Sequence, residues 1–315
     1  MDPVTHTLFG VAIGEAAFRP KWGRRAVTIS AWAANLPDID GIVMLYRDPS
    51  VVILRRSFGH SVFLLPLWVA GLAWIFHKKY DDIPFRDIAL IVGVNAAGHL
   101  LFDLINSFGV QLFWPFSWAR PELSLIFIID LALTGLLAAP HLARLKPEWR
   151  PRLRAACAGA IATVAVYFAA VGVLRARAVA ALTAVENGKS SFQYVFPEPF
   201  GPRRWRGVAK DDEARVWRVY LLDGLNAETK LKLQVPNDET SRPAAAARET
   251  RFGRRLMTFF KAPVWSVAAR PDGGATTTVY DLRFSSLLLK RAAAFSYSFD
   301  EEPGGAVKAR GVRIW

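Results

Sequence analysis

Residues Ala155 to Leu174 read AACAGAIATVAVYFAAVGVL, twenty positions without one charged side chain. A helix of about 20 apolar residues is long enough to cross the hydrocarbon core of a bilayer. Five further apolar runs precede it, at 3–18, 26–46, 61–76, 88–102 and 123–140. A buried helix of a soluble protein explains one such run more easily than six. The sequence therefore predicts a mainly α membrane bundle of about six hydrophobic helices.

The composition divides the chain into an apolar N-terminal part and a basic C-terminal part. Hydrophobic residues make up 52% of the 315 residues, yet the formal net charge is +13. Residues 1–174 contain 16 Lys and Arg against 12 Asp and Glu, whereas residues 175–315 contain 24 against 15. This composition excludes intrinsic disorder in the N-terminal part. The single cysteine, Cys157, excludes an intrachain disulfide. We expect a membrane domain at 1–175, a linker at 176–202 and an extramembrane domain at 203–315.

The back half has the pattern of a small β-rich domain. Alternating, β-branched or aromatic stretches predict strands at 216–222, 230–235, 264–269, 276–284 and 294–299, and an Ala/Arg-rich stretch predicts a helix over 243–260. No nucleic-acid-binding motif accompanies the basic charge, so no nucleic-acid partner is expected. No oligomeric state is predicted.

The basic residues of the loops predict an orientation in the membrane. Three loops, at 19–25, 78–86 and 143–154, contain twelve Lys and Arg between them. If all six runs span, the opposite short loops contain only Arg47, Arg55, Arg56 and Arg120. The positive-inside rule then makes the side with twelve basic residues cytoplasmic. We expect a multi-pass protein of the plasma membrane with an extracytoplasmic C-terminal domain.

Seven ionisable side chains lie inside or at the edges of the apolar runs, all toward the predicted outer side. A carboxylate at the centre of a membrane helix costs about 2.5–3.5 kcal/mol on insertion scales, so each needs a compensating partner. Imidazole and carboxylate groups together are the ligand set of zinc, manganese or iron. We interpret the seven as ligands of a divalent metal ion, with zinc favoured and manganese or iron as alternatives: His6, Asp38, Asp40, His60, His99, Asp103 and Asp130.

The spacing of these residues supports a shared site but leaves other interpretations open. His99 and Asp103 are four residues apart, so a helix presents both on one face. Asp38 and Asp40 are two apart behind Pro37, a spacing that points both at one ion only if the backbone is extended or broken. A polar network that joins helices and a proton or ion pathway through the bundle are the alternatives, because membrane proteins build both from these residue types.

Four motifs in this order resemble the YdjM-like family of bacterial inner-membrane proteins. They are Thr5-His6, Leu36-Pro37-Asp38-Ile39-Asp40, Gly59-His60-Ser61 and His99-Leu100-Leu101-Phe102-Asp103, and the resemblance covers about residues 1–142. Members are described as metal-dependent hydrolases, which implies metal ligation by His6, Asp38, Asp40, His60, His99 and Asp103. Two positions depart from the family pattern. Gly59 stands where many members have threonine, and Gly41 stands where some have histidine.

A site of this composition predicts hydrolysis of a phosphoester or related bond in a membrane lipid or lipid-linked substrate, because metal ions activate bound water and polarise phosphoryl groups. Asp38 and Asp103 are the expected catalytic residues. Arg56 and Arg120 lie on the same predicted side and are expected to bind the phosphate, since guanidinium groups bind phosphate in bidentate fashion. Alternatively, both arginines are interfacial charges that only contact lipid headgroups. A non-enzymatic relay or scaffold is the alternative function.

Overall fold

The structure is a computed structural model that describes residues 1–45, 51–290 and 295–314. Arg47, named above, and the ends of two expected elements, Tyr46 and Ala294, lie outside these ranges. The chain divides into two compact units, one of residues 1–42 and 55–172 and the other of residues 43–54 and 173–315. Each unit is described by itself.

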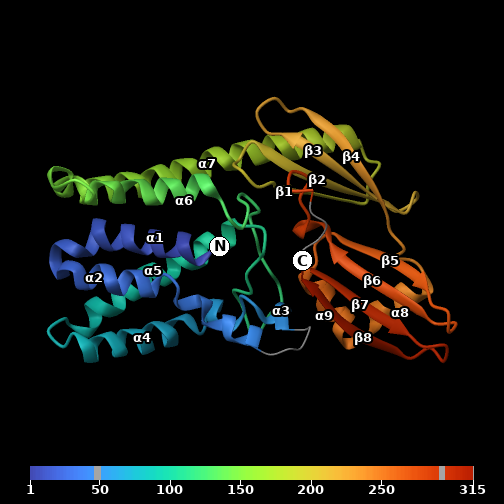
Figure 1. Ribbon diagram of the computed structural model, residues 1–315, viewed down its shortest axis with the longest axis horizontal. Coiled ribbons are helices and arrows are strands. Elements are labelled where there is room, and N and C mark those ends of the chain that lie inside the picture. Colours follow the sequence, from blue (N-terminus) through green and yellow to red (C-terminus); the bar gives the residue numbers. More distant parts are fainter. Residues whose placement is uncertain (46–50, 291–294, 315) are drawn as a thin grey trace. The chain divides into compact units, whose positions relative to one another are not determined.

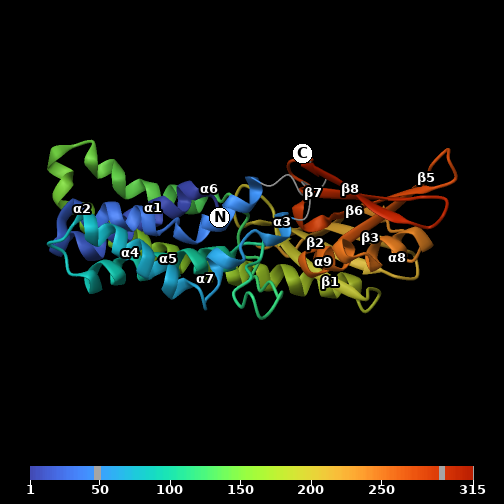
Figure 2. The ribbon, with the colours of Figure 1, turned by 90° about the horizontal axis from the view of Figure 1, so that it is seen from below.

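The first unit is helical. It contains α1 (Pro3–Ile13), a π-helical turn η1 (Gly14–Phe18), α2 (Arg19–Ala33), α4 (Leu65–Lys79), α5 (Phe85–Ile105), α6 (Leu131–Ala138) and the first part of α7 (Leu153–Glu186). Short 3₁₀ segments are η2 (Leu36–Leu45), η3 (Phe58–His60), η4 (Ala139–Arg144) and η5 (Pro147–Arg152). Helix α1 packs against α2 and α6, and α5 packs against α2 and α4 (Figures 1 and 2).

The apolar core of this unit lies between α2, α4 and α5. Ile29 of α2, Ala73 and Phe76 of α4, and Ile88 and Ile91 of α5 belong to one buried cluster. Its members recur at helical spacing along each segment, so each helix presents an apolar stripe to the other two. This packing holds α5 in the centre of the unit.

The described residues contain two helices that are long and apolar enough to cross a membrane. They are Phe85–Ile105 and the helical stretch Pro147–Glu186, and the bent pair Val51–His60 with Leu65–Lys79 would add a third. The expected six hydrophobic spans are therefore not confirmed.

Two of the expected spans are interrupted by irregular backbone. The run at 26–46 is α-helical only to Ala33 and continues as the 3₁₀ segment η2, which contains Pro37. The run at 123–140 is helical only from Leu131, because the backbone N–H groups of Leu123 and Leu125 donate instead to the carbonyls of Leu104 and Ile105 at the end of α5. In both places the interruption lies where polar side chains gather.

The second unit contains two four-stranded antiparallel sheets, each with its strands in chain order. The first is β1 (Phe192–Pro197), β2 (Arg204–Asp211), β3 (Val216–Asp223) and β4 (Thr229–Pro236). The second is β5 (Pro263–Ala269), β6 (Ala275–Asp281), β7 (Phe295–Glu301) and β8 (Val307–Ile314), with η6 (Leu282–Phe284) after β6. Helices α8 (Arg242–Glu249) and α9 (Arg251–Phe259) connect the sheets, and α3 (Val51–Leu54) packs against α9.

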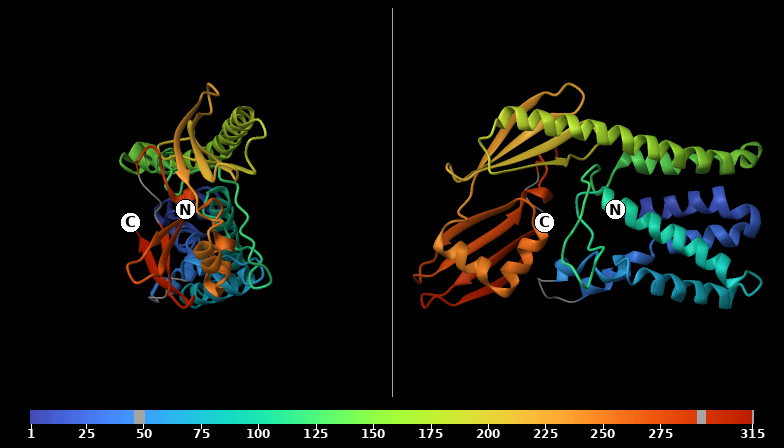
Figure 3. Two further views of the ribbon diagram at one scale, coloured as in Figure 1. Left: turned by 90° about the vertical axis from the view of Figure 1, so that its right-hand side faces the viewer. Right: turned by 180° about the vertical axis from the view of Figure 1, so that it is seen from behind.

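The β-rich domain that the sequence predicts is confirmed, with β1, β2 and β8 in addition to the expected strands. Phe196, Trp217 and Val264 belong to a core shared by the two sheets. Helix α8 packs against β5, β6 and β7 (Figure 3). The expected helix over 243–260 is broken at Thr250, whose side chain caps α9 by accepting from the backbone N–H of Gly253.

Residues 176–202, expected as a linker, contain the end of α7 and all of β1. The end of α7 lies against the first sheet, where a Cβ on Gly207 would stand 3.0 Å from Leu182 Cδ1. Glu186 then accepts from Tyr220 Oη at 2.5 Å and pairs with Arg218. These contacts stabilise the helical conformation of α7 beyond its apolar stretch.

Candidate metal centre

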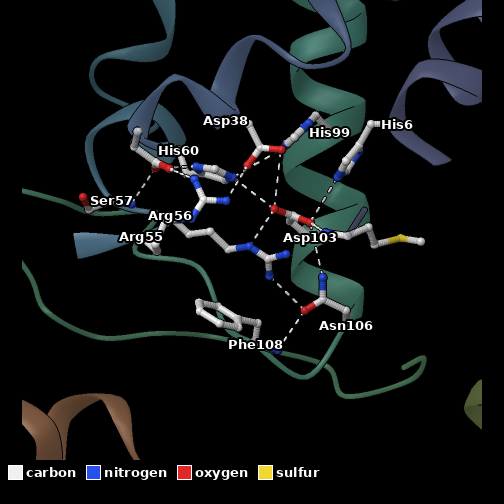
Figure 4. Close-up of polar contacts among 12 residues, drawn as sticks. His6, Asp38, Arg55, Arg56, Ser57, His60, His99, Asp103, Asn106 and Phe108 are labelled. Carbon is white, nitrogen blue, oxygen red and sulfur yellow. Dashed lines mark hydrogen bonds and ion pairs between the residues drawn. The ribbon is translucent and has the colours of Figure 1, made fainter. Parts of the chain in front are cut away.

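The centre of the site is the carboxylate of Asp103, which is fully buried on α5. Its Oδ2 atom lies 3.0 Å from His60 Nε2, 3.4 Å from His99 Nε2 and 2.9 Å from Arg56 Nε. His99 comes from the same face of α5, four residues earlier, as the helical spacing predicts. Figure 4 shows these side chains converging on Asp103.

The two histidines present their Nε2 atoms to each other at 3.2 Å. His99 Nδ1 lies 2.6 Å from the carbonyl oxygen of Ala34, and His60 Nδ1 lies 2.8 Å from Asp40 Oδ2. A carbonyl and an ionised carboxylate only accept hydrogen bonds, so each Nδ1 must carry the proton. In the neutral rings both Nε2 atoms are then acceptors, as is Asp103 Oδ2.

Three acceptors within 3.4 Å of one another cannot satisfy one another without a proton or a cation between them. Asp38 completes the group, since one ligand atom from each of Asp38, His60, His99 and Asp103 lies within 4.8 Å of the others. Two imidazole nitrogens and two carboxylate oxygens are a donor set of zinc, manganese and iron sites. The donor set and its convergence therefore fit a divalent cation.

Asp40 supports this group from outside. Its carboxylate is fully buried and accepts from His60 Nδ1 and, at 2.9 Å, from the backbone N–H of Ser57. A carboxylate on the far nitrogen of a ligating imidazole fixes its tautomer and orientation. Asp40, which the sequence predicts as a ligand, thus contacts the His60 ring and is not one of the four grouped residues.

Arg55 links the two aspartates of η2. Its guanidinium lies 3.3 Å from Asp38 Oδ1 and 3.1 Å from Asp40 Oδ1. A Cβ on Gly41 would stand 2.8 Å from Arg55 Nη1, the end of a flexible side chain that can shift. Gly59 lets the chain pass the carbonyl of Pro37, which a Cβ would meet at 2.0 Å. The departure from the family pattern at Gly59 is therefore a steric feature of this site.

His6 lies beside the group of four and is not part of it among the described residues. Its ring stacks on His99 with centroids 3.7 Å apart, and its Nε2 lies 3.3 Å from the other oxygen of Asp103, Oδ1. The amino group of Met1 and Asn106 Nδ2 also contact that oxygen. His6 thus contacts the group of four through Asp103.

Asp130 is not brought into the group of four. Its Oδ1 accepts from the backbone N–H of Leu133, which caps α6, and its Oδ2 accepts from Tyr167 Oη at 2.8 Å. An aspartate directly before a helix is a strong N-cap. Because Asp130 lies within an apolar run, the sequence does not show that a helix begins after it. The sequence therefore predicts a ligand at this position.

The two arginines expected to bind phosphate are held by the protein itself. Arg56 donates to Asp103 and to Asn106 Oδ1 at 2.9 Å, and its guanidinium lies 4.7 Å from the Phe108 ring centroid. Arg120 donates to the backbone carbonyl of Arg55 at 2.9 Å. Both therefore position the loop that precedes His60.

Sequence reasoning missed Arg55, Ser57 and the carbonyl of Ala34 as parts of the site. Charge balance could have indicated Arg55, since two carboxylates in an apolar run require a nearby cation. The contacts of Ser57 and Ala34 use backbone atoms, which residue types do not reveal.

Residues 1–178 match the sequence profile of the family described as YdjM inner membrane protein. The chain belongs to the YdjM family. It is also similar to YfhP of Bacillus subtilis (strain 168), described as an uncharacterized protein, with 29% identity over 137 residues. That match covers 41% of this chain and 42% of YfhP. No solved structure matches this member of the family.

If Asp40 orients His60 as a ligand, Asp40→Ala will weaken metal binding without removing a ligand. Loss of such outer partners costs about 10- to 100-fold in metal affinity. Chelator-competition titration of the detergent-purified protein measures this change. Asp130→Asn is the matched control, because it neutralises a buried carboxylate outside the group and keeps an N-cap residue; its metal affinity is expected to equal that of the wild type. Equal affinities for all three proteins would contradict the role of Asp40.

Proposed function

We propose that this YdjM-family chain is a membrane-bound, metal-dependent hydrolase of a phosphoester or related bond in a membrane-associated substrate. The observation that carries the proposal is the convergence of one ligand atom each from Asp38, His60, His99 and Asp103, with His60 Nε2, His99 Nε2 and Asp103 Oδ2 within 3.4 Å of one another. Arg56 Nε donates to Asp103 Oδ2, but in the neutral rings the Nε2 atoms of both histidines remain buried acceptors, which a bound cation would satisfy.

Asp38, His60, His99 and Asp103 would hold one divalent ion, with zinc favoured by the imidazole pair and manganese or iron as alternatives. When bound by these residues, such an ion would lower the pKa of water and would polarise the bond to be cleaved. His60 and His99 are fixed by their Nδ1 contacts, so the residues are oriented before substrate arrives.

The carboxylates of the site have different roles in this proposal. The side chain of Asp38 is 19% exposed, whereas those of Asp40 and Asp103 are fully buried. Asp38 is therefore the carboxylate that a substrate and an attacking water can reach, and we assign it the orientation of that water. Asp103 is the central ligand, and Arg56 and Asn106 hold it in place.

A cavity of about 470 Å³ beside Asp38 supports access from the membrane. Its lining includes Pro3, Ala31 and Trp32, with Thr7 and Asn35 as polar groups. Trp32 is exposed, which suits a mouth that faces acyl chains or the headgroup region. A mainly apolar cavity with a few polar groups beside a charged centre is typical of a ligand site. We infer that the substrate is a lipid or a lipid-linked molecule.

Arg55 is the arginine best placed to contact a substrate phosphate. Its side chain is 25% exposed, compared with 6% for Arg56. It contacts both Asp38 and Asp40, so it can hold an anionic oxygen beside Asp38. Arg56 and Arg120 would act by positioning this loop.

Replacement of a proposed ligand is expected to slow hydrolysis strongly. We expect His99→Ala to lower kcat/KM for bis(p-nitrophenyl) phosphate by about 100-fold or more, since even partners behind a ligand cost about 10- to 100-fold. The assay uses detergent-solubilised protein loaded with zinc or manganese, and Asp130→Asn serves as the matched control. A wild-type protein that binds metal yet cleaves neither this diester nor p-nitrophenyl phosphate would contradict the proposal.

A proton relay is the alternative function, and one observation favours it. His6, Asp103, His60 and Asp40 form a continuous series of contacts at 3.3, 3.0 and 2.8 Å. A relay of this kind would be free of metal and would give a pH-dependent proton flux in liposomes. Metal content therefore separates the two functions.

We further infer that the chain crosses the membrane several times and that its C-terminal domain is extracytoplasmic. The loops at 19–25, 78–86 and 143–154 contain the twelve Lys and Arg that support this orientation. The proposed metal site would then lie toward the outer leaflet.

The single cysteine allows a direct test of this topology. In a Cys157→Ser background, Lys189→Cys places a thiol at an exposed position after α7. A membrane-impermeant maleimide is expected to label it in intact spheroplasts. The matched variant Lys78→Cys should be labelled only after permeabilisation. The reverse pattern would place the C-terminal domain in the cytoplasm.

A further inference from the structure

A second cavity in the helical unit, of about 340 Å³, is lined by five charged side chains. They are Glu15, Arg19, Arg24, Arg144 and Arg150. Glu15 follows His6 by nine residues, which corresponds to about 14 Å of helix. This cavity is therefore separate from the metal centre, and the proposed hydrolase function makes no use of it.

Only part of the positive charge around the cavity is compensated. Glu15 is buried, and its carboxylate pairs with Arg19 and, at 2.7 Å, with Arg144. Arg24 and Arg150 have no carboxylate partner within residues 1–45, 51–290 and 295–314. Four guanidinium groups and one carboxylate leave a net charge of +3 on the cavity wall.

The cavity lies around an irregular turn, and its lining residues come from η1, α2, η4, η5 and α7. The π-helical turn η1 places Glu15 at its start, and π-helical turns are frequent at functional sites. Gly14 lets η1 lie close to α2, because a Cβ there would stand 2.8 Å from the Cα of Val27. Arg154 of α7 donates to the carbonyl of Ala16 at 3.2 Å. Gly23, with φ +62°, turns the chain directly before Arg24.

We propose that this cavity binds the phosphate group of an anionic lipid. Guanidinium groups match phosphate oxygens in bidentate geometry, and each retains donors beyond the one that Glu15 uses. The volume is within the range of small-ligand cavities. A phosphate would pair with Arg24 and Arg150 and compensate the surplus charge.

The surroundings favour a lipid over a free anion as the source of this phosphate. Leu142, Leu145 and Trp149 of the adjoining 3₁₀ segments are exposed, and Lys146 lies 4.7 Å from the Trp149 ring centroid. Exposed leucine and tryptophan beside lysine and arginine are typical of a segment at the membrane–water interface. Basic pockets between membrane helices on the cytoplasmic side bind lipid headgroups.

Native mass spectrometry of the full-length, detergent-purified protein with added phosphatidylglycerol tests this proposal. We expect Arg24→Gln/Arg150→Gln to weaken phosphatidylglycerol binding by about 10-fold or more. Neither residue pairs with Glu15, so this variant keeps the Glu15 contacts. The matched control is Arg86→Gln/Arg152→Gln, which removes two basic residues of the same predicted side that do not line the cavity; its binding should equal that of the wild type.

Parallel arms identify the source of the phosphate. Phosphatidylcholine with the same acyl chains measures binding without net negative charge, and glycerol 3-phosphate measures binding without chains. Selective loss of phosphatidylglycerol binding in Arg24→Gln/Arg150→Gln supports a lipid site. Tight binding of glycerol 3-phosphate that this variant loses would keep the phosphate site but overturn its lipid source. Equal phosphatidylglycerol binding by all three proteins, or none by the wild type, would overturn the proposal.

Discussion

The helical unit depends on the compensation of one buried carboxylate, Asp103, in an otherwise apolar helix. An uncompensated charge at this depth would cost several kcal/mol, so the chain must bring donors or a cation to it. Asp103 receives contacts from His6 of α1, from Arg56 and His60 of one loop, and from Asn106 directly after α5. The fold of the surrounding segments is largely the means by which these groups reach α5.

This requirement explains the irregular backbone around the site. The segment at 36–45 leaves the α-helical conformation where Asp38 and Asp40 must face Arg55. The stretch at 106–130 returns along the end of α5, and its backbone bonds to Leu104, Ile105 and Arg56 there. Irregular backbone at membrane depth is tolerated where it is buried in protein or lines a cavity. The need to compensate buried carboxylates therefore explains both the polar site and the short helices around it.

Much of this could be predicted from the sequence, and the exceptions have physical reasons. Residue type and spacing predict that His60, His99 and Asp103 meet, because an i, i+4 pair shares one face of a helix. The strands of the second unit follow from their alternating pattern, although β1 and β2 include polar and proline residues that weaken it. Asp130 could not be separated from the ligands, since a helix cap and a buried ligand have the same residue type. Hydropathy alone also does not show which apolar runs form continuous helices, because it does not record where backbone hydrogen bonds are diverted.

We propose above all that Asp38, His60, His99 and Asp103 hold one divalent cation. Metal content per chain, combined with X-ray absorption spectroscopy of the purified full-length protein, tests it most directly. We predict one bound zinc, manganese or iron ion with two imidazole nitrogens among its ligands, and loss of the metal in both His60→Ala and Asp103→Ala. A folded wild-type protein that binds none of these ions after each has been supplied would contradict the claim and assign the buried histidines and aspartates to a proton relay.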